Sequence, residues 1–566
     1  MRRRPVVVVA MALAMAGVTA LPGRTLTGGS WPQGHALPSF ASPHHLDVAD
    51  VESLPGDQQL LFNTLEGTVN RTEPRIYLLW GGDEGKRTWL DTLQAEDGVP
   101  VTDVAPWSLL GSYRASVAGM VIYDPKVPDS INVATTLAGV NGAVVASPAL
   151  APKLAAPPYR LPVIADLRGR FTDRLDAYTW AYEHLWATGA VTHRMLVGLP
   201  PLRSASVHLA EIGAVNVPLE PVYDTGALGA DPFPFLRDYA IASKAMVVWL
   251  DHNEPAERLL LERFLSGMPP DSPYLGTHAG DVAGEITIVA LLSSHSVYEV
   301  AADFFNNGSV FGGVRPTPTL PPSPPTTPSL GNKIYVTFTM SDGDNIQYDQ
   351  HRLRIMWDNP ARGRVPINWT ISPLLLDAAP AILDHYTRTA TANDLFMAGP
   401  SGAGYAYPSS WPDDTFGDFT RQTGDYMRRA GIDTLDVLNA PDGVRLPLSE
   451  AKARAYANDV GPKGIMLNYN FFNECRTDNV IVDDTPVTTG CFVASSSTAQ
   501  GEAEFDISQQ SLRWDGRSPL FLSIEFTAWN VTPADVVAVA STLDSRYVVV
   551  RADQYFDLVR AAHGLS

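Results

Sequence analysis

Two carboxylates and an amide crowd one short turn, residues 341–345 (SDGDN), directly after the apolar run at residues 334–340. Carboxylates this close can repel each other, which raises the pKa of one as an acid catalyst needs, or they can bind a cation. An Asp-Gly turn with solvated acids is also common in proteins. Because the preceding run has the composition of a buried strand, the position favours a functional role for Asp342 and Asp344.

A third acid, Glu525, stands between Ile524 and Phe526 at the end of another apolar run. An isolated carboxylate that ends a buried strand is costly unless it is paired, so either a catalytic role or a salt bridge must explain it. We predict that Glu525 forms a catalytic pair with Asp342 or Asp344, one group acting as acid and the other as base or nucleophile.

Tyrosines and amides that suit a polyhydroxylated ligand follow other predicted strands. The glycine-rich loop at residues 400–408 carries two tyrosines whose rings could stack on sugar faces while their hydroxyls hydrogen-bond. The alternative is that this loop packs on its own barrel. The candidate ligand-binding residues are Asn345, Tyr405, Tyr407, Trp411, Asn470 and Glu474.

Strand and helix patterns alternate regularly in the part of the chain that carries these residues. The predicted strands lie at residues 334–340, 366–371, 395–398, 434–438, 464–468, 520–525 and 547–550. The predicted helices between and after them lie at residues 375–389, 416–430, 448–457, 533–543 and 554–562. This α/β alternation predicts a closed or nearly closed parallel barrel of the (β/α)7-8 type, with its working face at the carboxyl ends of the strands.

The rest of the chain divides around a proline-rich segment at residues 314–329 (VRPTPTLPPSPPTTPS). Proline at this density disfavours helix and central strand, so we expect an extended, semi-rigid linker. Before it, residues 45–313 alternate between short strand and helix patterns, which predicts two or three small α/β domains. After it, residues 330–566 form the barrel domain.

The first 20 residues have the pattern of a signal peptide. Three arginines at positions 2–4 precede an apolar run that ends in Val18-Thr19-Ala20, a small-residue cleavage pattern. The run is too short to span a bilayer, and no later stretch is long and apolar enough, so we expect a secreted protein without a membrane span. The formal net charge of −20 over 566 residues argues against nucleic acid as a partner.

The only two cysteines, Cys475 and Cys491, lie close together in the sequence. In an oxidising compartment we expect them to form a disulfide, worth about 3 kcal/mol in the chain-entropy model, with two free thiols as the alternative. Two cysteines without neighbouring histidines do not make a zinc site, and there is no HExxH pair. The sequence therefore indicates no metal or cofactor, and it leaves the oligomeric state open.

Residues 402–408 (GAGYAYP) match letter for letter the GxGYxYP motif that names a family of glycoside hydrolases. Residues 70–77 (NRTEPRIY) resemble the opening of that family's N-terminal domain, and residues 341–345 resemble the start of its C-terminal domain. The resemblance implies a sugar-processing protein that acts outside the cytoplasm on a poly- or oligosaccharide, with small α/β domains before the barrel. It implies no particular catalytic pair.

Three functions remain open from the sequence. The first is glycoside hydrolysis by the carboxylate pair. The second is non-catalytic glycan binding in the cell envelope, with structural acids and binding by the tyrosines. The third is a metal-dependent polysaccharide deacetylase, because residues 339–343 (TMSDG) distantly resemble the opening of those enzymes; the His-x-x-x-His metal pair of that class is missing.

Overall fold

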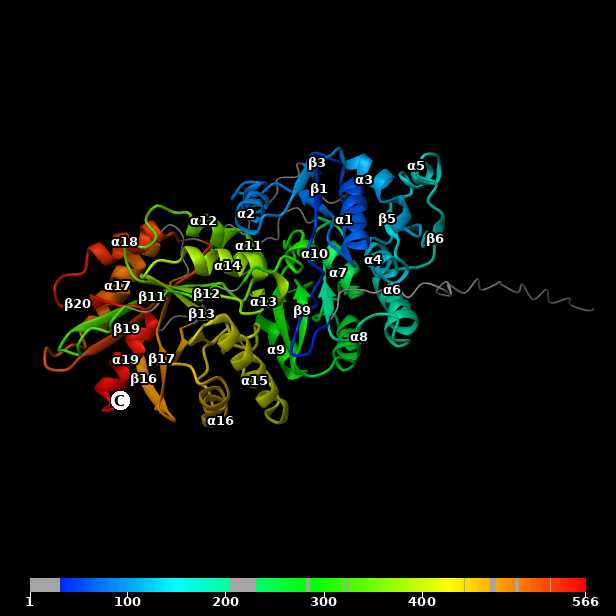
Figure 1. Ribbon diagram of the computed structural model, residues 1–566. Helices are drawn as coiled ribbons and strands as arrows, with labels where there is room; N and C mark the ends of the chain where they lie inside the picture. The colour runs from blue at the N-terminus through cyan, green and yellow to red at the C-terminus, as the bar shows by residue number, and fades with distance from the viewer. Residues whose placement is uncertain are drawn as a thin grey trace, which may run out of the picture.

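The computed structural model describes residues 31–203, 231–280, 286–317, 319–322, 325–441, 443–468, 475–493, 498–529 and 531–565. The predicted signal peptide at residues 1–20 and two predicted ligand-binding residues, Asn470 and Glu474, lie outside these ranges. Four sheets are present, three small ones in the N-terminal part and one large one in the C-terminal part. Figure 1 shows the N-terminal elements, coloured blue to green, packed on one side of the C-terminal elements, coloured green to red. The predicted α/β class, with a parallel barrel after smaller α/β sheets, is confirmed.

The first sheet has the strand order β2-β1-β3, and all its pairs are parallel. Its strands are β1 (Leu46–Asp50), β2 (Ile76–Leu79) and β3 (Val101–Asp103). The helices of this segment are α1 (Gly56–Asn70), α2 (Thr88–Asp97), α3 (Pro106–Ser112) and the short η1 (Arg114–Ser116).

The second sheet has the order β5-β4-β6, again with parallel pairs. Its strands are β4 (Met120–Ile122), β5 (Val144–Ala146) and β6 (Val163–Asp166). The helices of this segment are α4 (Ser130–Asn141), α5 (Ala151–Ala155), α6 (Arg174–Ala181) and the π-helical turn η2 (Tyr182–Trp186).

The third sheet has the order β10-β9-β7-β8 and is also parallel. Its strands are β7 (Leu196–Gly198), β8 (Met246–Val248), β9 (Ser272–Gly276) and β10 (Val297–Ala301). The helices of this segment are α7 (Arg237–Ser243), α8 (Pro255–Leu265), α9 (Ile286–Ser294) and α10 (Gly308–Phe311). We call this segment, residues 196–313, the third unit.

The large sheet forms the barrel. Its main strands are β11 (Ile334–Met340), β12 (Ile367–Ile371), β13 (Asp394–Ala398), β14 (Thr434–Asp436), β15 (Gly464–Leu467), β17 (Thr485–Thr489), β18 (Cys491–Val493) and β19 (Leu520–Phe526). Two further strands lie beside them, β16 (Asp478–Val482), antiparallel to β17, and β20 (Tyr547–Val549), which pairs with the start of β11.

Helices surround these strands. They are α11 (Ile346–Gln350), α12 (Arg352–Trp357), α13 (Leu375–Ala378), α14 (Pro380–Thr389), α15 (Asp413–Ala430), α16 (Glu450–Ala455), η4 (Tyr456–Val460), α17 (Ala499–Ser511), α18 (Pro533–Ser541) and α19 (Ala552–Ala562). Local sequence sets their ends: a capping box of Thr532 and Asp535 starts α18, and Gly431, with a φ of 70°, ends α15. Pro380 divides the single helix expected at residues 375–389 into α13 and α14, because proline cannot donate the backbone hydrogen bond of a helix interior.

One continuous segment closes the barrel. Strand β17 pairs in parallel with β15, and β18, only one residue further along the chain, pairs in parallel with β19. The residue between them is Gly490, where an added Cβ would lie 2.3 Å from Asn468 Oδ1 and 2.5 Å from the Ser523 carbonyl oxygen. Only glycine fits this crossing without moving its neighbours, so the closure depends on it.

The interior of the barrel changes character from its N-terminal to its C-terminal end. Near the strand starts, Tyr335, Met466 and Phe521 form an apolar cluster with Tyr555 and Phe556 of α19, which covers this end. One layer higher the lumen is polar: Asn368 donates hydrogen bonds to the hydroxyls of Thr337 (2.8 Å) and Thr339 (3.1 Å), and accepts one from the Ala552 amide (2.7 Å). The top layer, at the carboxyl ends of the strands, is acidic and is described below.

The N-terminal part and the barrel share one hydrophobic core rather than meeting at a thin contact. Side chains from both parts, such as Phe311 and Trp89 on one side and Tyr386 and Trp357 on the other, belong to the same buried cluster. None of the helices in the described ranges is long and apolar enough to cross a membrane.

The proline-rich segment at residues 314–329 forms no helix or strand in its described residues and lies against the barrel domain. The Thr319 amide donates to Asp384 (3.0 Å), and the Thr327 hydroxyl donates to Asp557 (2.9 Å). Gln554 of α19 donates to the carbonyls of Pro325 and Thr326. The segment therefore follows the surface of α14 and α19 rather than crossing open solvent.

Candidate active site

Two fully buried acids point into the top of the barrel. Asp436 is the last residue of β14 and pairs with Met466, a lumen residue, and Glu525 lies in β19 opposite Thr339, whose hydroxyl also faces the lumen. Residues opposite each other in parallel strands share a face of the sheet, so both carboxyl groups face inward. Both side chains are 0% exposed.

The surroundings of these two acids favour their uncharged forms. Burial raises the pKa of Asp436 to about 8, and the negative charge of Asp342 adds to this effect. Burial also raises the pKa of Glu525 well above its usual range, and the charges of Asp436 and Asp342 raise it further. The Val437 amide and the Asn468 side chain oppose these shifts in part, but in the described ranges no donor meets either carboxyl group in good hydrogen-bond geometry.

The turn after β11 places Asp342 beside this pair. Its neighbour Ser341 donates from both its amide (3.1 Å) and its hydroxyl (3.2 Å) to the Phe526 carbonyl, directly after Glu525. The Gly343 amide donates to Thr370 Oγ1 (2.9 Å), and a Cβ on Gly343 would lie 2.0 Å from the Thr370 carbonyl carbon. Asp342 is half-buried, which makes it the most accessible of the three acids at the barrel mouth.

The other acid of the turn, Asp344, faces a different group. It is buried, and its charge raises the pKa of Asp349, which burial has already raised well above the usual range. Asn345 caps α11, because its side-chain oxygen accepts the Tyr348 amide (3.0 Å). Of the two aspartates predicted as partners of Glu525, the structure therefore brings Asp342 into electrostatic contact with it.

Asn468, directly after β15, and Ser523 of β19 lie at the base of the site. Asn468 Oδ1 accepts a hydrogen bond from the Ser523 hydroxyl (3.1 Å), which fixes the orientation of the amide, and the amide lowers the pKa of Glu525. Arg445 donates to the carbonyls of Leu467 (3.2 Å), Asn468 (3.3 Å) and Gly490 (2.8 Å), so it joins the ends of β15 and β17.

The two tyrosines of the GAGYAYP loop lie in the contact between the barrel and the third unit. Tyr405 exchanges backbone hydrogen bonds with Glu299 of β10 (2.8 and 2.9 Å), and its hydroxyl lies 2.9 Å from that of Tyr407. The Tyr407 amide donates to Ser293 Oγ of α9 (3.0 Å). Tyr405 is 4% and Tyr407 0% exposed, so both rings are packed against protein in this structure, and their stacking on a sugar stays a prediction.

Trp411 is also buried, which differs from its predicted role at a ligand site. Its ring packs on Phe419 with the centroids 4.8 Å apart, and its indole nitrogen donates to Thr415 Oγ1 (3.2 Å). The ring therefore fills the core between the loop after β13 and α15.

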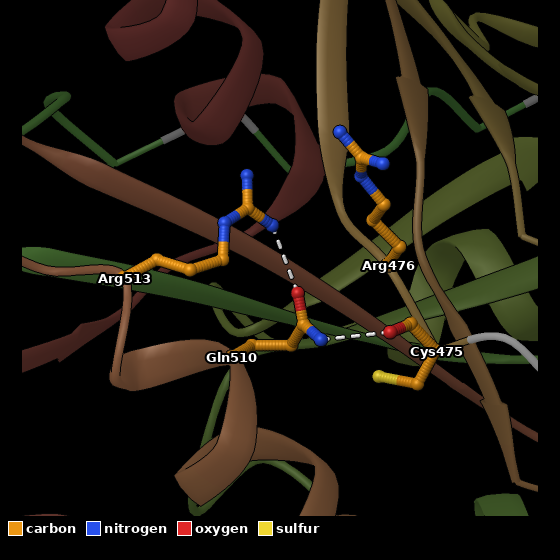
Figure 2. A pocket seen from close by; sticks show the side chains of 4 residues that line it. All are labelled: Cys475, Arg476, Gln510 and Arg513. Carbon is orange, nitrogen blue, oxygen red and sulfur yellow. Dashed lines mark hydrogen bonds between the residues drawn. The ribbon is translucent and has the colours of Figure 1, made fainter.

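The predicted disulfide between Cys475 and Cys491 is present. Beside it lies a surface pocket of about 410 Å³, lined by Cys475, Arg476, Gln510 and Arg513. Figure 2 shows Gln510 bridging two of these residues, accepting from Arg513 (2.8 Å) and donating to the Cys475 carbonyl (2.7 Å). Both arginines form ion pairs with Asp478 (2.7 and 3.3 Å), so the pocket has little unbalanced positive charge.

In the described ranges one group of three possible metal ligands lies close together, Cys475, Cys491 and Asp506. Two of its members are the sulfurs of the disulfide, which are not available as thiolate ligands. The donor set needed by a metal-dependent deacetylase is therefore not found among these residues.

Sequence reasoning missed Asp436 and Asn468 as members of the site. Asp436 lies inside the run Thr434-Leu435-Asp436-Val437-Leu438, whose composition predicts only a strand. An acid flanked by apolar neighbours at a strand end is the same signal that identified Glu525, and it applies equally here. Asn468 stands at the end of the next predicted strand, two residues before the predicted Asn470.

Comparison with known proteins gives matches along most of the chain. A family model described as "GxGYxYP putative glycoside hydrolase C-terminal domain" matches residues 332–560. Models of the first, second and third N-terminal domains of the same family match residues 45–115, 117–189 and 222–313. No curated protein is similar enough in sequence to count as a relative.

Among solved structures, a protein from Bacteroides thetaiotaomicron VPI-5482 described as a "putative hydrolase" has the same fold, with a TM-score of 0.77. It is 20% identical, and the match covers 94% of this chain and 97% of that one. A structure described as "T48 deacetylase with substrate" has a TM-score of 0.23 at 13% identity, over 41% of this chain and 92% of that one. That likeness is too slight to carry an argument.

Proposed function

Because the chain belongs to the GxGYxYP family, whose C-terminal domain carries a glycoside hydrolase description, we propose that it hydrolyses glycosidic bonds at the barrel mouth. In this proposal Glu525 is the general acid and Asp342 is the base or nucleophile. The predicted signal peptide supports action outside the cytoplasm as part of the same proposal.

The observation that carries the proposal is the contrast between these two carboxyl groups. An acid catalyst must hold its proton at the pH at which it works, and burial beside other acids raises the pKa of Glu525 well above its usual range. Asp342 is half-buried, and its negative charge acts on both buried acids. Two carboxyl groups whose surroundings differ in this way suit the acid and base roles of a glycosidase.

The roles follow from where protons and charge move. Glu525 donates its proton to the oxygen of the glycosidic bond as that bond breaks, and Asp342 either attacks the sugar carbon or deprotonates a water that does. The separation of the two groups decides which: about 5–5.5 Å gives retention of the anomeric configuration, and about 6.5–9.5 Å gives inversion. The anomer first formed, followed by NMR, reports the outcome directly.

The test uses the chain from residue 21 with a panel of natural glycans and matching aryl glycosides. Glu525→Gln should lower the hydrolysis of natural glycans by about 10²–10⁴-fold, the usual contribution of a general acid. Aryl glycosides with acidic leaving groups need less protonation, so the same variant should lose much less activity on them. Asp342→Asn should lose activity on both kinds of substrate, because its role does not depend on the leaving group.

Asp344→Asn is the matched control. It removes a carboxylate from the same turn, but the charge of Asp344 raises the pKa of Asp349 and not that of Glu525. It should retain most of the activity. Release of no sugar from any glycan, with binding retained, would replace this proposal with the non-catalytic glycan-binding function. Full activity of Glu525→Gln on natural glycans would remove Glu525 from the catalytic role.

A further inference from the structure

Two fully buried carboxyl groups, Asp436 and Glu525, project into the top of the lumen, and no residue in the described part of the chain forms an ion pair with either. Strands β14 and β19 lie on opposite sides of the barrel, with β15 and β17–β18 between them in one direction and β11, β12 and β13 in the other. Asp436 and Glu525 extend inward from these strands, and the charge of Asp436 acts on Glu525. In the described ranges, the charged groups that act on this pair are acids.

The groups around the pair make ionisation of both acids unfavourable. Among the described residues, the titratable and charged groups on the segments that follow these strands include Asp342 and Asp344 after β11, the hydroxyls of Tyr405 and Tyr407 after β13, and Arg445 after β14. The Arg445 guanidinium donates to three backbone carbonyls at the ends of β15 and β17. Apolar side chains of the same region, Leu438 and Phe492, belong to one buried cluster with both tyrosines.

From this geometry we propose that Asp436 is a positioning residue that keeps the proton on Glu525. The inference rests on the proposed acid role of Glu525, and it assigns a task to a side chain that would otherwise only destabilise the fold. Two fully buried carboxyl groups that project into the same lumen cannot both be charged at low cost, so a proton stays on the pair. When Glu525 gives its proton to the leaving oxygen, the new charge forms beside a neutral Asp436. Glu525 is then reprotonated by the hydrolytic water if Asp342 is the nucleophile; if Asp342 is the base, Asp342 takes the water's proton and Glu525 regains one from solvent.

A purely structural carboxyl group at this position would have partners that satisfy it. Asp394, at the opposite end of the barrel, is such a group: Arg362 (2.6 Å), the Trp369 indole (2.9 Å) and Thr391 all bind it. Asp436 has no comparable donor in the described ranges. Its environment is that of a group held for its proton rather than for its hydrogen bonds.

The experiment measures the proton on Glu525 in two independent ways. Infrared difference spectra between the wild-type protein and Glu525→Gln isolate the protonated carboxyl band of Glu525, and the same difference is then taken in an Asp436→Asn background. The amide that Asp436→Asn introduces cannot ionise. Glu525 should therefore lose its proton at a pH at least one unit lower than in the wild type. The basic limb of the pH profile of kcat/KM should move in the same direction, while KM changes little.

Asp436→Glu should restore most of the wild-type profile, because it returns a second carboxyl group to the lumen. Asp271→Asn is the control: Asp271 is a half-buried acid whose pKa burial raises to about 7, and its backbone carbonyl accepts from Gln422 of α15, away from the mouth. It should leave both readouts unchanged. If Asp436→Asn fails to fold, Asp436→Ser provides the same neutral replacement with less bulk.

The outcomes separate this inference from the proposed function. Hydrolysis whose basic limb is the same in Asp436→Asn as in the wild type would overturn the role of Asp436 and leave the function standing. A protein that hydrolyses no glycan but shows the infrared shift would overturn the function and retain the proton-holding pair. An infrared band of Glu525 that is absent at neutral pH would overturn both.

Discussion

The two ends of the barrel contain buried acids in opposite circumstances. At the N-terminal end, Asp394 binds Arg362, Trp369 and Thr391, and Asp553 is paired with Arg551. At the C-terminal end, burial and neighbouring acids raise the pKa of Asp436 and Glu525, and the described residues supply no basic partner.

The difference separates an end of the barrel where partners stabilise the buried acids from an end where burial keeps the acids uncharged. A buried charge is tolerable when a cation and hydrogen bonds replace its lost hydration, as at Asp394. A buried acid without them keeps its proton instead and makes the fold less stable as the pH rises. The same residue types are therefore paired with cations at one end and kept uncharged at the other, as the proposed proton transfer requires.

The largest loss of stability should come from removing a buried acid that has an ion-pair partner and several hydrogen bonds, at the N-terminal end of the barrel. Asp394→Ala leaves the Arg362 guanidinium without its 2.6 Å partner and removes three further hydrogen bonds, so it should lower the free energy of unfolding by about 3–5 kcal/mol. Urea denaturation followed by circular dichroism measures this. Asp544→Ala, which breaks an exposed pair with Arg546, is the control and should leave the midpoint nearly unchanged. A loss at Asp394 no larger than in this control would contradict the contrast.

Gly490→Ala tests the closure that holds the mouth together. The added methyl group would lie 2.3 Å from Asn468 Oδ1 and 2.5 Å from the Ser523 carbonyl, so the variant should lose about 2–3 kcal/mol and displace the Asn468 amide. Gly501→Ala, in α17, meets nothing within 4 Å and should be neutral or slightly stabilising. Equal stability of the two variants in thermal melts would show that the crossing between β17 and β18 is looser than the structure indicates.

Asp436→Asn should raise the free energy of unfolding at high pH, whereas most substitutions of buried residues lower it. The folded protein holds the Asp436 proton up to about pH 8, whereas the unfolded chain releases it near pH 4, so wild-type stability falls as the pH rises between these values. An amide has no proton to lose, and the variant should therefore be more stable than the wild type at pH 8, by about 1–3 kcal/mol. At pH 4 the difference should vanish. Urea midpoints at pH 4, 6 and 8 measure it, and destabilisation that is the same at every pH would rule out the buried neutral acid.

Much of this contrast could be predicted from local sequence. Apolar runs located the strands β11 to β15 and β19, because a buried parallel strand needs a continuous apolar stretch. The same runs placed Asp342 and Glu525 at the carboxyl ends of strands. The short strands β16, β17 and β18 are not predicted, because aspartates and Pro486 interrupt the Val, Ile and Thr residues of this segment and leave no continuous apolar run.

The environment of each acid could not be predicted in the same way. Whether Asp394 meets Arg362, or Asp436 meets no cation, depends on which distant segments the barrel brings together. The tyrosines illustrate the same limit: Glu299, which pairs with Tyr405, lies in another sheet, so their burial followed only from the packing of the third unit on the loop. Composition identified the residue types, and tertiary packing decided their roles.

The smallest expected effect concerns the tyrosine pair beside the mouth. Tyr407→Phe removes one hydroxyl of the 2.9 Å contact with Tyr405, which should cost about 0.5–1.5 kcal/mol, the usual net value of a buried hydrogen bond. Tyr405→Phe should cost a similar amount, and the double variant should lose less than the sum, because both single changes break the same hydrogen bond. If the tyrosines serve packing rather than sugar contact, KM for any glycan substrate should stay the same in all three variants. A raised KM with unchanged stability would instead return these rings to the ligand site and extend the functional end of the barrel into the third unit.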